Sequence, residues 1–448
     1  MFREAKFQIS LAEDADHGWR DLVNGVNFRL DEDRIARVWC SYLPPLLRDL
    51  ARVGAAVYVA DRLVRRPRRS GGTGRQLALR VDVSSPEFWS KQASSIARIL
   101  GVVSNDVWNL EFRPGMPTAA QSGLFCEGEP PPLVCLYSGG LDSAAGLVNR
   151  LRDGVRSIVT VTVCHQPGQR RRVLQQLEAF RRHYNARIVP IVVRTTLKRA
   201  PALKYQELSQ RCRSFLFNAI GGAVAATVGA SGVEIYESGV GVLNLPSMTG
   251  MLVGARATKS CHPQLLRLMT EFVTAIAGCL IEFSLPFVHQ TKAEVARAFA
   301  TENLEAIVPQ TISCVHYPVR IRGTAKQCGL CFACIGRRQA LFAAGVDDPA
   351  SQYQHDILAA GGKLTSAHLE SLRANLFQVA RLAELSSHQL PNWFSRHLYG
   401  SQVVHKADSA EPWRDLMLRY RAEWLEWIEH GRQRRLEWAE LVNPLKAA

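Results

Sequence analysis

The chain has 448 residues, which is too long for one ordinary hydrophobic core and predicts two or three domains. Hydrophobic residues make up 47% and charged residues 21%, a globular balance, and no run approaches the roughly 18 consecutive apolar residues of a membrane helix. The net charge of +15 favours polyanionic partners such as nucleotides or nucleic acid, although an arginine-rich chain can also be basic without binding them. The first residues contain no apolar core of a secretory signal, so we expect a cytoplasmic location and no membrane contact.

Residues 1–126 mix short apolar runs with turn signals and contain no catalytic signature. Residues 53–64 and 75–83 are apolar enough to be strands or short helices. Residues 85–101 have the spacing of an amphipathic helix that ends at Gly101. We therefore expect an α+β accessory domain in this region.

A regular alternation of strands and helices begins after the proline-rich linker at residues 128–132. Residues 133–137 form a short, continuous apolar run, as a buried parallel strand does, and residues 144–154 form the helix that follows it. The further expected elements are strands at 157–163, 186–193 and 233–236 and helices at about 170–184 and 206–229. This order predicts an α/β domain with a doubly wound parallel sheet, in which ligands bind at the carboxyl ends of the strands.

Residues 350–448 are predicted to form a helical C-terminal region. Its last helical stretch, residues 411–442, interleaves four tryptophans with arginine and glutamate. These tryptophans are Trp413, Trp424, Trp427 and Trp438. Aromatic residues among basic ones can stack on nucleobases, but aromatic residues at helical spacing more often pack in a core, and we expect the core arrangement.

The hexamer Ser138-Gly139-Gly140-Leu141-Asp142-Ser143 directly follows the first strand of the alternation and opens a helix. Its two glycines let the backbone turn tightly and approach a ligand, and the N–H groups at the helix start can cradle an anion. The hydroxyls of Ser138 and Ser143 can donate to phosphate oxygens. The Asp142 carboxylate would repel phosphate unless Mg²⁺ bridged the two. We therefore expect residues 138–143 to bind the phosphates of a nucleotide, and a family resemblance carried by the same residues implies that the nucleotide is ATP and that Asp142 and Ser143 are catalytic.

With a strand before it and a helix after it, this hexamer resembles the SGGxDS loop of the PP-loop superfamily, the N-type ATP pyrophosphatases. The resemblance implies an adenine-nucleotide α-hydrolase-like fold. It also implies that the loop holds the β,γ-pyrophosphate of ATP while a nucleophile attacks the α-phosphorus and forms an adenylate. A Walker A sequence does not occur in the chain, which excludes a Walker-type NTPase.

Four of the eleven cysteines cluster late in the chain with the spacing C-x13-C-x2-C-x2-C. They are Cys314, Cys328, Cys331 and Cys334. Four thiolates at such spacing can form a closed tetrahedral Zn²⁺ site, which would be structural because it leaves no open position. Cysteine spacing alone also permits an iron–sulfur cluster. His316 could replace a cysteine, although we expect it to be an ordinary loop residue.

The hexamer and the cysteine cluster together resemble QueC, the 7-cyano-7-deazaguanine synthase family, over roughly residues 133–345. By this resemblance the four cysteines are the zinc ligands, and Lys292 in the segment 291–294 reaches the nucleotide phosphates. A surface lysine at a helix start is an equally good interpretation of Lys292.

The chain departs from an ordinary QueC in several ways. It is about twice as long, and the segment 164–177 keeps only Gly168-Gln169-Arg170 of the family's motif at this place. The long form, with residues 237–246 and 261–263, resembles the QueC-like proteins of bacterial antiphage systems. QatC of the Qat system is the first such resemblance, and the QueC-like protein of type IV CBASS is the second.

The resemblance implies a 7-carboxy-7-deazaguanine-type substrate. Glu237, at the end of a strand, could bind its guanine edge, and a cation could bind its carboxylate. The candidates for that cation are Arg170, Arg320 and Arg322, of which we assign Arg170 a catalytic role. Arg170 could equally be the exposed start of a helix.

We therefore expect a ligase that uses ATP, Mg²⁺ and Zn²⁺ to adenylate a deazaguanine carboxylate and then form a C–N bond. The product would be a nitrile, an amide or a conjugate with a partner protein encoded in the same operon, in antiphage defence. A PP-loop enzyme that modifies tRNA or DNA is the alternative. A non-enzymatic scaffold with a relict loop is a third hypothesis. The presence of Asp142 argues against it, because a relict loop has no reason to keep this residue.

Overall fold

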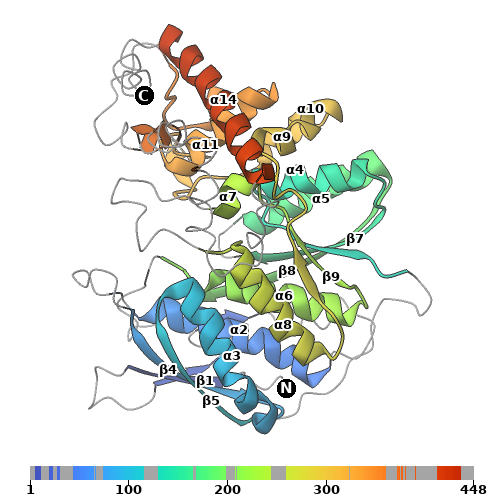
Figure 1. The fold of residues 1–448 in the computed structure, drawn as a ribbon, viewed down its shortest axis with the longest axis vertical. Coiled ribbons are helices and arrows are strands. Elements are labelled where there is room, and N and C mark those ends of the chain that lie inside the picture. Colours follow the sequence, from blue (N-terminus) through green and yellow to red (C-terminus); the bar gives the residue numbers. More distant parts are fainter. Residues whose placement is uncertain are drawn as a thin grey trace.

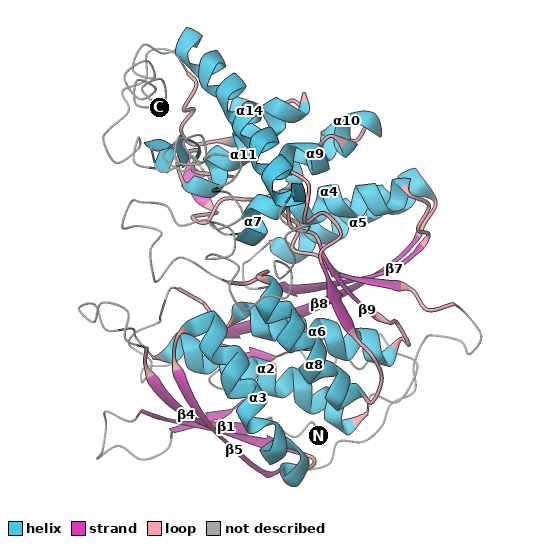
Figure 2. Ribbon diagram, in the orientation of Figure 1, coloured by secondary structure: helices cyan, strands magenta, loops and turns pink. Residues whose placement is uncertain are grey.

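The computed structural model describes most of the chain, and the fold is mixed α/β with a central sheet of mainly parallel strands (Figures 1 and 2). The described residues are 6–11, 20–23, 28–30, 44–64, 66, 74–115, 130–164, 168–197, 207, 209–243, 259–321, 323–359, 371–373, 375–376, 379, 389 and 411–434. Among them, no helix combines the length and the apolar character that a membrane crossing requires.

The central sheet has six strands in the order β10-β9-β6-β7-β8-β3. Five of them run parallel, and β3 (Phe28–Leu30) pairs antiparallel with β8 (Arg187–Leu197) at one edge. The other strands are β6 (Leu133–Leu136), β7 (Ser157–Cys164), β9 (Gly232–Ile235) and β10 (Glu282–Ser284). Nearly every side chain of β7 is buried, as in a parallel strand covered on both faces. The parallel-dominated sheet agrees with the alternation in the sequence.

Helices cover both faces of this sheet, and β6 divides its side chains between two hydrophobic cores. Val134 belongs to the core that contains α6 (Arg213–Thr227) and α8 (Pro263–Ala277). Cys135 belongs to the core on the other face. The helices of that face are α4 (Leu141–Arg152), α5 (Gln169–Tyr184), α9 (Lys292–Ala296) and α10 (Ala298–Thr301).

The N-terminal region adds a second sheet and two long helices. The sheet has the order β2-β1-β4-β5. Its strands are β1 (Lys6–Leu11), β2 (Arg20–Val23), β4 (Gln76–Val83) and β5 (Val107–Pro114). Helices α2 (Pro45–Leu63) and α3 (Pro86–Ser104) lie between this sheet and the helices α6 and α8 of the central sheet (Figure 1).

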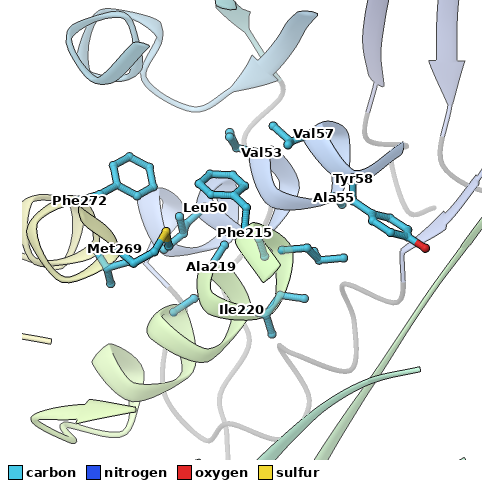
Figure 3. Packing of buried hydrophobic residues seen from close by; sticks show 14 of the residues in the cluster. Leu50, Val53, Ala55, Val57, Tyr58, Phe215, Ala219, Ile220, Met269 and Phe272 are labelled. Carbon is cyan, nitrogen blue, oxygen red and sulfur yellow. The ribbon is translucent and has the colours of Figure 1, made fainter. Parts of the chain in front are cut away.

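The packing between α2 and α6 is close enough to make one continuous core. A Cβ added to Gly54 would lie 3.1 Å from the Cβ of Ala219. Figure 3 shows Leu50 and Val53 of α2, Phe215 and Ile220 of α6, and Met269 and Phe272 of α8 in this core. Residues 53–64, which the sequence left open between strand and helix, therefore belong mainly to a helix that is buried almost all round.

Two predicted helix boundaries are wrong. The helix expected to end at Gly101 continues to Ser104, and Asn105, with a φ of 63°, ends it. The helix expected to begin near residue 206 begins at Arg213, because Gln210 has a φ of 47° and cannot continue a right-handed helix. Cys212 then donates its backbone N–H to Asp61 of α2 at 3.0 Å, which fixes the start of α6 on the N-terminal region.

The C-terminal region packs a third core around α11 (Phe332–Ala344) and α14 (Glu411–Arg434). Trp413, Trp424 and Trp427 of α14 are fully buried in it, which confirms the core arrangement for these three. Trp438 lies outside the described residues. The remaining short elements are α7 (Gly239–Leu243), η1 (Glu305–Gln310), β11 (Val319–Ile321), β12 (Thr324–Lys326) and η2 (Ala350–Gln352).

Candidate functional site

The phosphate loop, residues 138–143, leaves the carboxyl end of β6 and forms the first turn of α4. Gly139 has a φ of +75°, and a Cβ at this position would lie 2.8 Å from Cγ2 of Val173. Gly140 occupies the N-cap of α4, and Leu141 is the first residue of the helix. A side chain at residue 139 would thus meet both an unfavourable backbone conformation and a steric clash.

The two serines of the loop meet at the start of α4. Their hydroxyl oxygens lie 3.1 Å apart, and the Ser143 hydroxyl donates to the carbonyl oxygen of Gly140 at 3.0 Å. Ser138 is exposed and Ser143 is buried, so one hydroxyl faces solvent and the other supports it. The arrangement combines hydroxyls with the positive end of a twelve-residue helix, which suits an anion.

Two glutamine side chains of α5 form hydrogen bonds with the backbone of the phosphate loop. The buried Gln176 donates to the carbonyl oxygens of Gly139 at 3.3 Å and Gln310 at 2.9 Å, and accepts from the Tyr137 hydroxyl at 2.7 Å. Gln169 donates to the carbonyl oxygen of Ser138 at 3.2 Å. The carbonyl oxygens of Ser138 and Gly139 therefore both accept hydrogen bonds from side chains of α5. From the sequence, Gln169 was named only as part of the motif at residues 168–170 and Gln176 was not named, although their spacing of seven residues places them on one helix face.

Lys292 and Asp142 form an ion pair at the loop, although 150 residues separate them in the chain. Lys292 Nζ lies 2.5 Å from Oδ2 of Asp142, and the side chains are 29% and 20% exposed. Burial disfavours the charge of Lys292, but the charges of Asp142 and Glu237 outweigh it and raise the pKa of the ammonium group. The structure therefore places Lys292 at the phosphate loop and not on a remote surface.

Oδ1 of Asp142 is buried and has no hydrogen-bond partner among the residues that the structure describes. A buried carboxylate oxygen in this state is costly unless a cation or a donor reaches it. The donor chemistry of this position therefore fits a Mg²⁺ ion, which prefers carboxylate and phosphate oxygens.

Glu237 follows β9 and lies in the electrostatic field of the same ion pair. Burial and the charge of Asp142 raise the pKa of Glu237 to about 7, while the charge of Lys292 opposes this effect. The backbone N–H of Ser238 donates to the Glu237 carboxylate at 3.2 Å. Glu237 is thus a polar group next to the loop at the carboxyl edge of the sheet.

The four cysteines come together as a candidate metal centre. All four residues are buried, and the Sγ atoms of Cys328 and Cys334 lie 3.8 Å apart. Two sulfurs that each bind a zinc ion at about 2.3 Å in a tetrahedron are separated by about 3.8 Å, so this pair fits zinc. The backbone N–H groups of Cys328 and Cys331 donate to the sulfurs of Cys314 and Cys328, which would stabilise thiolate charge.

His316 also lies at this cluster, contrary to the expectation of an ordinary loop residue. One ligand atom from each of Cys314, His316, Cys328 and Cys331 lies within 4.8 Å of the others. His316 is exposed, whereas Cys334 is fully buried. The cluster therefore offers five donors for four zinc positions, with either Cys334 or His316 completing the shell.

The segment before Cys314 links this cluster to the phosphate loop. The Gln327 side chain accepts from the backbone N–H groups of Ser313 and Cys314 at 3.0 and 3.1 Å. The backbone N–H of Ile312 donates to the carbonyl oxygen of Gly139 at 3.3 Å. Hydrogen bonds of residues 312–314 therefore connect the candidate metal centre to the phosphate loop.

Among the described residues, neither Arg170 nor Arg320 makes a hydrogen bond or ion pair with residues 138–143. Arg170 is exposed and lines an open groove of about 710 Å³ on the outer face of α5, with Arg171 and Arg182. Arg320 is exposed on β11, Lys326 lies on β12, and Arg322 lies outside the described residues. A direct contact between Arg170 and a ligand on the loop stays a prediction.

Comparison with known proteins gave one family. The model of the queuosine biosynthesis protein QueC matches residues 256–345. The matched segment contains Lys292 and the four cysteines, and it begins after the phosphate loop. No curated protein matches the chain. The match supports the assignment of this segment as QueC-like.

Proposed function

We propose that the chain is a QueC-like ATP-dependent ligase that adenylates the carboxylate of a 7-carboxy-7-deazaguanine-type substrate. The observation that supports this most strongly is the ion pair between Lys292 and Asp142. Lys292 belongs to the segment that the QueC family matches, and Asp142 belongs to the phosphate loop outside it. The ion pair therefore joins a residue of the family match to a residue of the loop motif, and these are two independent lines of support.

In the proposed reaction, a substrate carboxylate oxygen attacks the α-phosphorus of ATP and the bond to the β-phosphate breaks. Pyrophosphate leaves with both electrons of that bond, and the carboxylate becomes an acyl-adenylate. The start of α4 and the serine hydroxyls bind the departing phosphates, and Lys292 neutralises the charge that develops on them. When bound, Mg²⁺ would be held by Asp142 and would neutralise the phosphates further.

A nitrogen nucleophile then attacks the acyl carbon, and AMP leaves. The product is an amide. Conversion of the amide to a nitrile needs a second ATP, which adenylates the amide oxygen so that this oxygen leaves with AMP while the nitrogen loses its two protons. We propose a zinc ion in the cysteine cluster as a purely structural element. Glu237 is the proposed acceptor for the N–H groups of the guanine edge.

The first experiment is product analysis with ATP, 7-carboxy-7-deazaguanine and ammonium as the nitrogen nucleophile. The proposal requires AMP and pyrophosphate, and it requires that Asp142→Ala abolish their formation. Asp153→Ala is the matched control, because Asp153 ends the same helix with a side chain that is 47% exposed. Equal product formation by wild type and Asp142→Ala would refute the site.

The acceptor of the acyl group extends this proposal. We propose a protein partner encoded in the same operon, in an antiphage setting. Mass spectrometry of a co-expressed partner should show the added deazaguanine. An unmodified partner together with free 7-cyano-7-deazaguanine would contradict conjugation.

A PP-loop enzyme that modifies tRNA or DNA is a second candidate. The observation in its favour is the groove on α5, where Arg170, Arg171 and Arg182 face solvent beside a single acid, Glu178. The candidate predicts nucleic-acid binding that weakens steeply with salt. The buried tryptophans of α14 are not available for stacking on bases.

A further inference from the structure

We propose that Glu423 of the C-terminal helix α14 is a positioning residue for Lys292, acting through Thr291. The inference rests on the proposed function, because it assigns Lys292 a role at the phosphate loop. It makes the C-terminal region a part of the ATP site and not an appended module. In Figure 1, α14 lies in the same region as α9, and it packs on α7 and α11.

Lys292 is the first residue of a short helix whose start depends on its N-cap. Helix α9 has five residues, and so short a helix is unstable without external contacts. Its N-cap is Thr291, whose hydroxyl oxygen accepts from the backbone N–H of Glu294 at 3.1 Å. The Glu294 side chain accepts from the backbone N–H of Thr291 at 2.8 Å, which completes a capping box.

Glu423 anchors this cap from the neighbouring element. The Thr291 hydroxyl donates to Oε1 of Glu423 at 2.6 Å, so one hydroxyl both caps α9 and binds α14. Thr291 is fully buried and Glu423 is 8% exposed. A carboxylate in such a place costs stability unless its bonds repay the lost hydration. The burial of this carboxylate beside the N-cap of α9 therefore favours a positioning role for Glu423.

The segment of α14 that carries Glu423 is packed in a hydrophobic core. Its neighbours Trp424 and Trp427 are fully buried in the C-terminal core. A second contact lies at the exposed side, where Arg419 pairs with Glu294 at 2.7 Å and donates to the carbonyl oxygen of His289 at 2.8 Å. Exposed ion pairs contribute little to stability, so the hydrogen bond to Glu423 is the stronger candidate for the contact that holds the start of α9.

The position of the Lys292 side chain depends on the N-cap, because the two residues are adjacent in the chain. Thr291 precedes Lys292 directly, so a shift of the cap moves the base of the side chain whose Nζ lies 2.5 Å from Asp142. Misplacing a reacting group by about 1 Å can cost on the order of 100-fold in rate. Removal of the Glu423 carboxylate should therefore lower kcat and leave the KM for ATP nearly unchanged.

The first test measures pyrophosphate release by Glu423→Leu, Glu423→Gln and Glu426→Leu. Glu423→Leu should lower kcat at least tenfold. Glu423→Gln should restore it, because the amide oxygen still accepts from Thr291. Glu426 is an exposed glutamate on the same helix, and its replacement should have no effect. A kcat for Glu423→Leu equal to that of wild type would overturn the proposal.

A double mutant separates positioning from loss of fold. Thr291→Val removes the same hydrogen bond from the other side. If the two residues act as one unit, the Thr291→Val/Glu423→Leu protein should be no slower than the slower single variant. Fully multiplicative losses of the two single variants would contradict a shared contact.

A second readout does not need the reaction. The rate at which an amine-selective acylating reagent modifies Lys292, followed by mass spectrometry, reports how tightly Asp142 holds it. The rate should rise severalfold in Glu423→Leu and stay at the wild-type value in Glu423→Gln and Glu426→Leu. Inactive wild type with this pattern would refute the proposed function alone, and equal labelling of all four proteins would refute the positioning role.

Discussion

The side-chain amide of Gln176 donates to the carbonyl oxygen of Gly139 and so fixes the phosphate loop to helix α5. The same nitrogen donates to Gln310, at the end of η1 and shortly before the cysteine cluster. One buried side chain therefore joins the loop, the helix behind it and the segment that leads to the metal centre.

Removal of this amide should loosen the loop. Gln176→Leu leaves the carbonyl oxygens of Gly139 and Gln310 without this donor and the Tyr137 hydroxyl without its acceptor. We expect a loss of about 1–3 kcal/mol in the free energy of unfolding and about a tenfold weaker affinity for ATP. Denaturant unfolding measures the change in stability, and titration calorimetry measures the change in affinity for ATP. Gln175→Leu is the control, because Gln175 lies on the exposed face of the same helix, and an equal effect there would count against the brace.

Gly139 should tolerate no side chain. Gly139→Ala combines a φ of +75° with a 2.8 Å contact to Val173, whereas a Cβ at Gly154, with a φ of +94°, meets nothing within 4 Å. Both variants should lose roughly 1–2 kcal/mol to backbone strain. Gly139→Ala should lose about 1–3 kcal/mol more from crowding and should also bind ATP more weakly. Unfolding curves that place the two variants at the same stability would show that the contact is relieved without cost.

The metal centre should hold one zinc ion per chain, with Cys334 as its fourth ligand. Cys334→Ser should reduce the bound zinc in metal analysis, whereas His316→Ala should retain it. Cys279→Ser, at an exposed free cysteine, is the neutral control. Because Ile312 bonds to Gly139, zinc loss should also weaken ATP binding. Retention of zinc by Cys334→Ser and its loss from His316→Ala would assign the fourth position to the histidine.

Glu423 should make stability depend on pH. Burial raises its pKa from 4.5 to about 7, the hydrogen bond from Thr291 lowers it, and Glu294 and Arg297 act in opposite directions. A carboxyl whose pKa is higher in the folded than in the unfolded state contributes stability only while it is protonated. That contribution is complete below about pH 4.5 and is lost as the pH rises through 7.

Glu423→Gln removes this titration, so the variant should gain on wild type as the pH rises. Between about pH 5 and pH 8 we expect the difference in the free energy of unfolding to grow by up to about 3 kcal/mol in favour of the variant. Thermal unfolding across this range measures the trend. A difference that is constant with pH would mean that Glu423 titrates normally.

The local signals in the sequence predicted most of what depends on a short stretch of chain. A strand, two glycines and a helix start are encoded within residues 133–152, and the cysteine spacing is equally local. Residues 53–64 were ambiguous because this part of α2 is buried almost all round, so no exposed polar face marks it as a helix. Neither Gln176 nor Glu423 could be found this way, because each gains its role from a partner more than 30 residues away.

The central claim is tested most directly by exchange of labelled pyrophosphate into ATP. Formation of an acyl-adenylate is reversible, so the protein should catalyse this exchange when 7-carboxy-7-deazaguanine is present. The exchange should disappear without that carboxylate and in Asp142→Ala. Substrate-independent formation of ADP and phosphate, or exchange that survives in Asp142→Ala, would contradict adenylation at the loop of residues 138–143.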